Sequence, residues 1–219
     1  MSAIESLQYI PLKLDETIQS YARTFALRQA TPEKRKQVYL NTLAVCAVHS
    51  YLSWMEFETD PTVANCWHQL GQTFQDVADL YLEDFGIIEC RPIERGETEV
   101  QLPPEVQENR LACVLVLIEN TYDRVKILGA YLPDDKDTLP AQIQLSQLKS
   151  CEELLDYLED LEPLPQESEE NLPVTSDVSD TSSSELGNIF PQLSPDLQNK
   201  LRQILQPQVL ASLLNQGKE

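Results

Sequence analysis

The stretch that decides the fold is KQVYLNTLAVCAVHSYLSWMEFETD, residues 36–60, the most apolar part of a very acidic chain. Its apolar side chains recur at helical spacing and cover most of the circumference, which is typical of a helix buried in protein or in lipid. A membrane span needs about 20 mostly apolar residues, whereas this stretch is interrupted by an Asn, a Thr, a His and two Ser and ends in acids. We therefore expect a buried central helix that begins at Thr31, a good N-cap followed by proline, and ends near Phe57.

The charge of the chain limits its partners. The 219 residues include 36 Asp and Glu against 16 Lys and Arg, so the formal net charge is −20. Residues 152–185 alone hold 12 acids and no Lys or Arg. Phosphate backbones need clustered basic residues and anionic membranes repel acidic surfaces, so we expect no nucleic acid and no membrane as partner. An acidic surface favours a protein partner with a basic surface.

The cysteines and the first residues bear on location. The five cysteines are odd in number and have no regular spacing. The opening MSAIESLQYIPLKLDE lacks the charged start and the long apolar core of a secretory signal. We therefore expect free thiols and a cytoplasmic protein.

The pattern along the chain predicts an α+β fold. Hydrophobic residues make up 42% of the chain, which is enough for a core. A first helix is expected at residues 15–30, and residues 58–73 are interpreted as a loop with one helical turn. Short strands, an extended piece and a last helix should follow, at 76–82, 86–93, 98–104, 111–119, 124–132 and 146–162. The expected domain, residues 1–160, thus has N-terminal helices packed on an antiparallel sheet of about four strands, with 111–119 as its core strand.

Two further segments follow the expected domain. Residues 161–187 are rich in Ser, Pro and acids, a composition that cannot bury enough apolar area to order itself, so we expect a disordered acidic linker. Residues 188–219 have the pattern of a short amphipathic helical tail. Its apolar residues would form a recognition surface for a partner groove: Leu197, Leu201, Ile204, Leu205, Leu210, Leu213 and Leu214. The alternative is that the tail folds back onto the domain.

The cysteines raise two chemical possibilities, a reactive thiol and a zinc site. Cys46 and His49 stand three residues apart on the central helix, a spacing that lets an imidazole activate a thiol. The pair lies within the most apolar helix, which favours a packing role. Zinc binding is not indicated either, because no two cysteines have the C-x-x-C spacing.

A pair of acids gives the alternative site. Asp79 lies on one expected strand, and Glu89 and Arg91 lie on the next. Nucleases of the restriction-enzyme type place acids in this way to hold a divalent ion. Here Arg91 occupies the place of the usual lysine, and a guanidinium cannot lose its proton to act as a base.

Several segments together resemble a cyanobacterial family known only as domain of unknown function 1822. They are YLNTLAVCAVHSYLSWMEFETD (39–60), GIIECRPI (86–93), LACVLVLIE (111–119) and KILGAYLP (126–133). The resemblance covers about residues 5–160 and leaves the linker and tail outside. It implies a cyanobacterial, cytosolic protein with a regulatory setting, and it implies no catalytic residue. Where members typically carry a WNP-like element, this chain has CWHQL, residues 66–70.

The sequence therefore predicts a non-catalytic adaptor or regulator that binds a protein and acts on a transcription or signalling component. The tail helix would be its recognition element, and no cofactor is expected. The alternative is a metal-dependent hydrolase that uses Asp79 and Glu89. The oligomeric state is left open.

Overall fold

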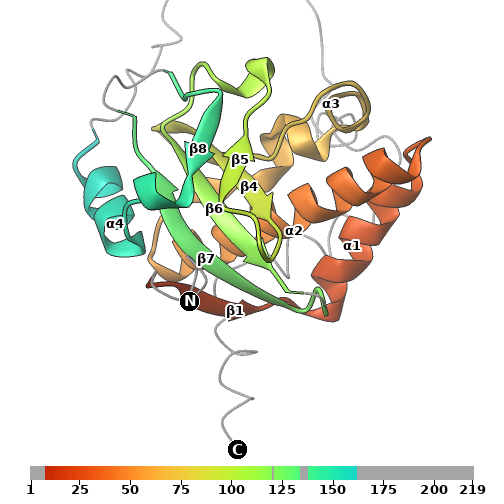
Figure 1. Ribbon diagram of the computed structural model, residues 1–219, viewed down its shortest axis with the longest axis horizontal. Helices are drawn as coiled ribbons and strands as arrows, with labels where there is room; N and C mark the ends of the chain where they lie inside the picture. The colour runs from red at the N-terminus through yellow and green to blue at the C-terminus, as the bar shows by residue number, and fades with distance from the viewer. Residues whose placement is uncertain (1–7, 120, 134–137, 162–219) are drawn as a thin grey trace, which may run out of the picture. The chain divides into compact units, whose positions relative to one another are not determined.

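The computed structural model describes residues 8–119, 121–133 and 138–161. The fold is α+β, as expected (Figure 1). Its helices are α1 (Glu16–Leu27), α2 (Pro32–Trp54), α3 (Gln69–Phe74) and α4 (Cys151–Glu159). Its strands are β1 (Ile10–Lys13), β2 (Thr59–Asp60), β3 (Asp79–Leu82), β4 (Gly86–Ile93), β5 (Glu99–Gln101), β6 (Ala112–Ile118), β7 (Arg124–Tyr131) and β8 (Gln142–Gln144).

The central helix forms as the sequence predicts. Thr31 caps α2 by accepting a hydrogen bond from the amide of Lys34, and Pro32 occupies the first turn. The residues from Leu40 to Val48 are all buried. Asp15 caps α1 in the same way, through the amide of Ile18 at 2.8 Å. In Figure 1, α2 crosses behind the sheet with α1 beside it. No helix in the described part of the chain is long and apolar enough to cross a bilayer.

The main sheet differs from the prediction in size. It has six strands in the order β1-β7-β6-β4-β3-β2, not about four. The two strands that were not expected are its edges, β1 and β2. They have only four and two residues, too few for an alternating pattern to be recognised.

The sheet also differs in direction, because β4 and β6 pair in parallel. The remaining pairs of this sheet are antiparallel. A parallel pair needs a long crossover, and the chain between Ile93 and Ala112 supplies it. The extended piece expected at 98–104 lies in this crossover. Its strand, β5, pairs with β8 in a separate sheet of two strands, which lies in front of the main sheet in Figure 1.

The core strand is confirmed. All seven residues of β6 are buried, and α2 packs against this strand. In Figure 1, α2 lies behind the sheet and the β5–β8 pair lies in front of it. The β6–β7 hairpin is antiparallel, as the sequence predicts. The last helix is shorter than expected, because residues 145–147 form a 3-10 turn and α4 starts only after its N-cap Ser150.

The outer side of β7 is closed by two different segments. β1 pairs with Arg124–Ile127, and farther along the strand Ala130 pairs with Lys149 through two backbone hydrogen bonds of 3.0 and 2.8 Å. The register of β7 against β6 shifts between these two contacts, at Leu115 and Val116. Gly129 lies at the shift with a φ of 132°. A glycine is needed there, because few other residues adopt this conformation.

Candidate functional site

The acids expected on neighbouring strands do come together. Asp79 on β3 pairs directly with Glu89 on β4, and Glu89 and Arg91 lie on the same face of β4 because side chains alternate along a strand. The side chain of Glu89 is 0% exposed and that of Arg91 is 4% exposed. The structure therefore brings Asp79, Glu89 and Arg91 together, and it places them inside the domain.

Glu89 is the centre of a buried network of charges. One carboxylate oxygen, Oε1, accepts the backbone amide of Ala78 at 2.9 Å and lies 2.8 Å from Nε of Arg91. The other, Oε2, lies 3.3 Å from Nε of Arg110, which is itself buried. Both oxygens thus have internal partners. The sequence did not indicate Arg110, because it comes just before β6 and is brought to Glu89 only by the parallel pairing.

Arg91 extends the network to α2. Its Nη1 forms an ion pair with Oδ1 of Asp76 at 2.6 Å, and its Nη2 donates to the backbone carbonyl of Asp76. Asn41 on α2 donates to the same carboxylate at 3.0 Å and to the carbonyl of Val77 at 3.1 Å. The buried charges therefore join the central helix to the start of β3.

Asp79 has a different task. Its two carboxylate oxygens accept the backbone amides of Asn65 and Cys66, at 2.9 and 2.7 Å, and its backbone carbonyl accepts the thiol of Cys66. Asp79 is thus the anchor of the 3-10 turn Asn65–Trp67, which leads into α3.

Burial and neighbouring charges shift the pKa values of Glu89 and Asp76 in opposite directions. Burial raises the pKa of Glu89 above its usual value, although the charges of Arg91 and Arg110 oppose this effect. Burial acts in the same sense on Asp76. There, however, the charge of Arg91 and hydrogen bonds from Asn41 and Arg91 prevail, and the pKa of Asp76 is lowered.

The shift at Asp76 predicts how stability depends on pH. A carboxyl whose pKa is lower in the folded than in the unfolded chain stabilises the fold above its unfolded pKa of about 3.9, and this contribution is lost as pH falls through the folded value. Asp76→Asn should therefore lower the free energy of unfolding at pH 7, and its difference from wild type should shrink below about pH 4. Urea denaturation of both proteins at several pH values measures this. A difference that is constant with pH would contradict the assignment.

The network offers little to a metal ion in this arrangement. Arg91 and Arg110 occupy the oxygens of Glu89, and two backbone amides occupy those of Asp79. Among the described residues, no group of three or more His, Cys, Asp and Glu side chains is placed to hold a metal ion. The acids thus act as internal acceptors that fix loops.

The Cys46 and His49 pair is also buried. Burial raises the pKa of the Cys46 thiol to about 12, so the nucleophilic thiolate is not favoured at neutral pH. His49 lies 2.6 Å from the hydroxyl of Thr59 through its Nδ1. The other four cysteines are free and buried as well.

The accessible feature near this network is α3, which sequence reasoning interpreted only as a helical turn. Leu70 and Phe74 are 73% and 80% exposed, and they are four residues apart, so they lie on one face of this short helix. We refer to these two residues as the α3 surface. A helix of six residues is too short to be detected by periodicity, although two apolar residues at this spacing were visible in the sequence.

The segment that carries the α3 surface is fixed to the core at several points. Gln72 is buried and donates to the carbonyl of Cys66 at 2.8 Å, while Lys34 on α2 donates to the carbonyl of Gln75 at 2.7 Å. Trp67 packs edge-on against Phe25 of α1, with ring centroids 5.1 Å apart. The exposure of the α3 surface is thus a property of an anchored segment.

The predicted tail residues lie outside the described part of the chain. They are Leu197, Leu201, Ile204, Leu205, Leu210, Leu213 and Leu214. The same holds for nearly all of the expected linker, which begins at residue 161.

Comparison with known families agrees with the resemblance seen in the sequence and extends it. The chain belongs to the family described as Protein of unknown function (DUF1822), whose model matches residues 12–218. The match includes the linker and tail, which the resemblance had left outside. No curated protein and no solved structure matches the chain.

Proposed function

We propose that this protein is a non-catalytic, protein-binding regulator that presents the α3 surface to a protein partner. The observation that carries this proposal is the exposure of Leu70 and Phe74 on an anchored segment. Burying either side chain in a partner would be worth about 1.5–3 kcal/mol, the usual gain for a large apolar residue. Leu70 and Phe74 are neighbours on one helix face, and contiguous exposed apolar surface is what marks interaction sites.

The charge of the whole chain favours a basic partner. Just after α3, the amide of Asp76 donates to the carboxylate of Glu105 at 3.0 Å, so two acids lie beside its end. Two cations lie next to them: Lys34, which holds α3 at Gln75, and Arg91, which forms the ion pair with Asp76. With a net charge of −20 on the whole chain, long-range attraction would guide a partner with a basic rim and an apolar pocket.

The tail is the second proposed recognition element. Its residues Leu197, Leu201, Ile204 and Leu205 have the spacing of an amphipathic helix that docks in a groove. The family match, which continues to residue 218, supports a role for the tail that is shared within the family. The partner we have in mind is a component of transcription or signalling, in a cytoplasmic setting.

The test compares four full-length proteins as baits in lysate of the source organism. They are wild type, Leu70→Ser with Phe74→Ser, Leu201→Ser with Leu205→Ser, and the control Leu27→Ser. Leu27 is a matched control because it is also 73% exposed but lies on α1. We expect the partner captured by wild type and by Leu27→Ser to bind the α3 variant at least about tenfold more weakly, since central apolar contacts dominate interfaces.

Two outcomes would overturn parts of this proposal. Equal capture of the partner by all four proteins would contradict a role in binding for both the α3 surface and the tail. Stabilisation of the wild type by Mn²⁺ that is lost in Asp79→Asn would instead favour the alternative, a metal-dependent hydrolase.

A further inference from the structure

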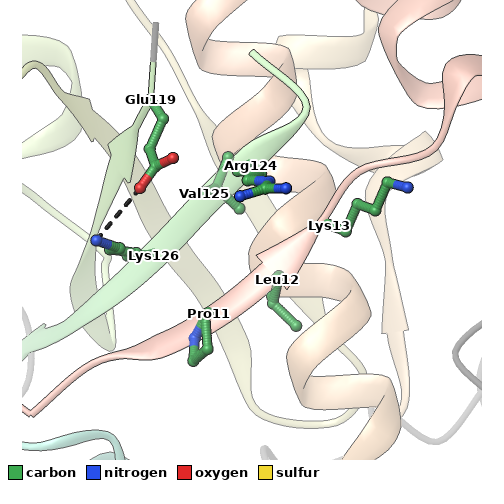
Figure 2. Close-up of a pocket in the computed structure, with 7 residues that line it drawn as sticks. All are labelled: Pro11, Leu12, Lys13, Glu119, Arg124, Val125 and Lys126. Carbon is green, nitrogen blue, oxygen red and sulfur yellow. Dashed lines mark ion pairs between the residues drawn. The ribbon is translucent and has the colours of Figure 1, made fainter. Parts of the chain in front are cut away.

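A second site lies at the other end of the sheet, on the outward side of β1 and β7. An open groove of about 470 Å³ is present there (Figure 2), and we call it the β1–β7 groove. It is far along the strand order from β3, which anchors the α3 segment. Its lining is Pro11, Leu12, Lys13, Glu119, Arg124, Val125 and Lys126.

The groove brings together cations of like charge. Lys13 and Arg124 are directly paired across β1 and β7, and both are exposed. The amide of Leu14 donates to the carbonyl of Asp123. The alternation of an antiparallel ladder then makes Lys13 and Arg124 a non-hydrogen-bonded pair, in which side chains are closest. Like charges directly opposite one another destabilise a sheet.

One cation of the groove, Lys126, is paired with an acid. Lys126 forms an ion pair with Glu119 at 3.2 Å, and its ammonium lies 4.5 Å from the ring centre of Tyr9. The ion pairs between described residues do not include Lys13 or Arg124. In Figure 2, Lys126 turns toward Glu119, and the guanidinium of Arg124 lies between Lys126 and Lys13. Within the described ranges, Lys13 and Arg124 thus have no carboxylate in an ion pair, although the chain has more than twice as many acids as bases.

A neighbouring acid, Asp123, interacts electrostatically with these two cations. The pKa of Asp123 is lowered, first by a hydrogen bond with Thr121 and in smaller part by the charges of Arg124 and Lys13. The nearest acids on the chain after Lys13 are Asp15 and Glu16, and Asp15 is already engaged as the N-cap of α1. Three cations, Lys13, Arg124 and Lys126, thus line the groove against two nearby acids, Glu119 and Asp123. At physiological ionic strength the Debye length is about 8 Å, so most of the remaining negative charge is screened from the groove.

We propose that the β1–β7 groove binds the phosphate group of an organic ligand between Lys13 and Arg124. A guanidinium presents paired donors to phosphate oxygens, and an ammonium adds a point charge. A phosphate dianion would turn the repulsion between the two cations into attraction to a shared anion. Pro11 supplies an apolar wall for the organic part of the ligand, and Lys126 stays paired with Glu119.

The edge position of β1 favours side chains over backbone as the means of recognition. β1 is the outermost strand of its sheet, yet Pro11 in its middle has no amide hydrogen to offer an added strand. A ligand that paired along this edge would therefore lack a hydrogen bond there. The charged side chains on the outward face are therefore the groups that would bind a ligand.

The experiment measures binding to the full-length protein by calorimetry, with three probes at constant ionic strength: inorganic phosphate, pyrophosphate, and a phosphoserine peptide with its unphosphorylated form. We expect inorganic phosphate, pyrophosphate and the phosphoserine peptide to bind and to raise the melting temperature of the protein. Lys13→Gln and Arg124→Gln should each weaken binding about tenfold. The control Lys36→Gln, at an exposed lysine with its own carboxylate partner in Glu94, should not change it.

The probes also separate the two sources of phosphate. Tighter binding of the phosphoserine peptide than of pyrophosphate identifies a phosphorylated protein as ligand, and the reverse order identifies a small phosphate compound. Binding of none of them at about millimolar concentration overturns the proposal. An equal loss of binding in Lys36→Gln also overturns it, because binding would then depend on the overall charge of the protein and not on the groove.

A second measurement applies to the unliganded protein. Since Lys13 and Arg124 repel each other, Lys13→Gln should leave the melting temperature unchanged or raise it. A clear decrease would mean that Lys13 has a structural partner, and it would overturn the role assigned to this residue.

Discussion

Glu89→Ala should lower the free energy of unfolding by about 3–5 kcal/mol, the usual cost of removing one partner from a buried ion pair. The change removes the carboxylate that Arg91 and Arg110 share in the interior. Arg91 keeps its ion pair with Asp76, whereas Arg110 keeps backbone carbonyls alone as its partners. The change also leaves the amide of Ala78 without its acceptor. Urea denaturation followed by circular dichroism measures the loss.

An exposed ion pair is the control for Glu89. Lys36 and Glu94 are 2.6 Å apart, but their side chains are 57% and 44% exposed. Lys36→Ala should therefore destabilise the fold far less than Glu89→Ala, because exposed ion pairs contribute little to stability. Similar losses in the two variants would mean that the Glu89 network is not desolvated as the structure shows.

A compensated variant tests the same point in the opposite direction. Replacing Glu89, Arg91 and Arg110 together with apolar residues of similar volume removes the three buried charges. Asp76 then loses its ion pair, but its side chain is 35% exposed and keeps the hydrogen bond from Asn41. Such replacements are often neutral or stabilising. We expect the triple variant to recover a large part of the stability lost in Glu89→Ala. If it is less stable than the single variant, then packing, and not charge, explains the loss.

Gly129→Ala is the second change with a large expected effect. A Cβ at this position would lie 2.1 Å from the backbone carbonyl oxygen of Lys149, and the φ of 132° is one that few L-residues adopt. Backbone strain costs about 1–3 kcal/mol and overpacking a similar amount. We expect a loss of about 3 kcal/mol or more, because the oxygen belongs to a backbone that is hydrogen-bonded to Ala130.

Gly96 provides the matched control for Gly129. Its φ is 99°, also in the left-handed region, but an added Cβ would meet nothing within 4 Å. Gly96→Ala should thus show the conformational cost alone, about 1 kcal/mol. The difference between the two variants measures the collision with Lys149. If both lose the same amount, then the segment before α4 moves aside and does not constrain β7.

The parts of the fold that were predictable are those in which local signals and burial agree. Thr31 and Pro32 mark the start of α2, and the uninterrupted apolar run of β6 marks a strand covered on both faces. The parallel pairing of β4 with β6 was not predictable. A sequence of short strands suggests hairpins, and the crossover between these two strands contains a strand of its own, β5.

The candidate sites likewise have a part that was predictable from the sequence and a part that was not. The pairing of Asp79 with Glu89 follows from strand positions that the sequence indicates. Their burial does not, because Arg110 and Asp76 reach the network only through tertiary structure. The β1–β7 groove was missed because its cations belong to segments more than a hundred residues apart, each unremarkable alone.

That separation also has a consequence for the order in which the chain assembles. β1 ends at Lys13, whereas its partner strand begins at Arg124. During synthesis, α1 and α2 emerge and can pack against each other long before β7 exists. Closing so long a loop is slow, and β1 gains little in return, since it contributes only four residues. The first strand of the chain should therefore be among the last to join the sheet, and the chemistry of the groove should appear only when folding is nearly complete.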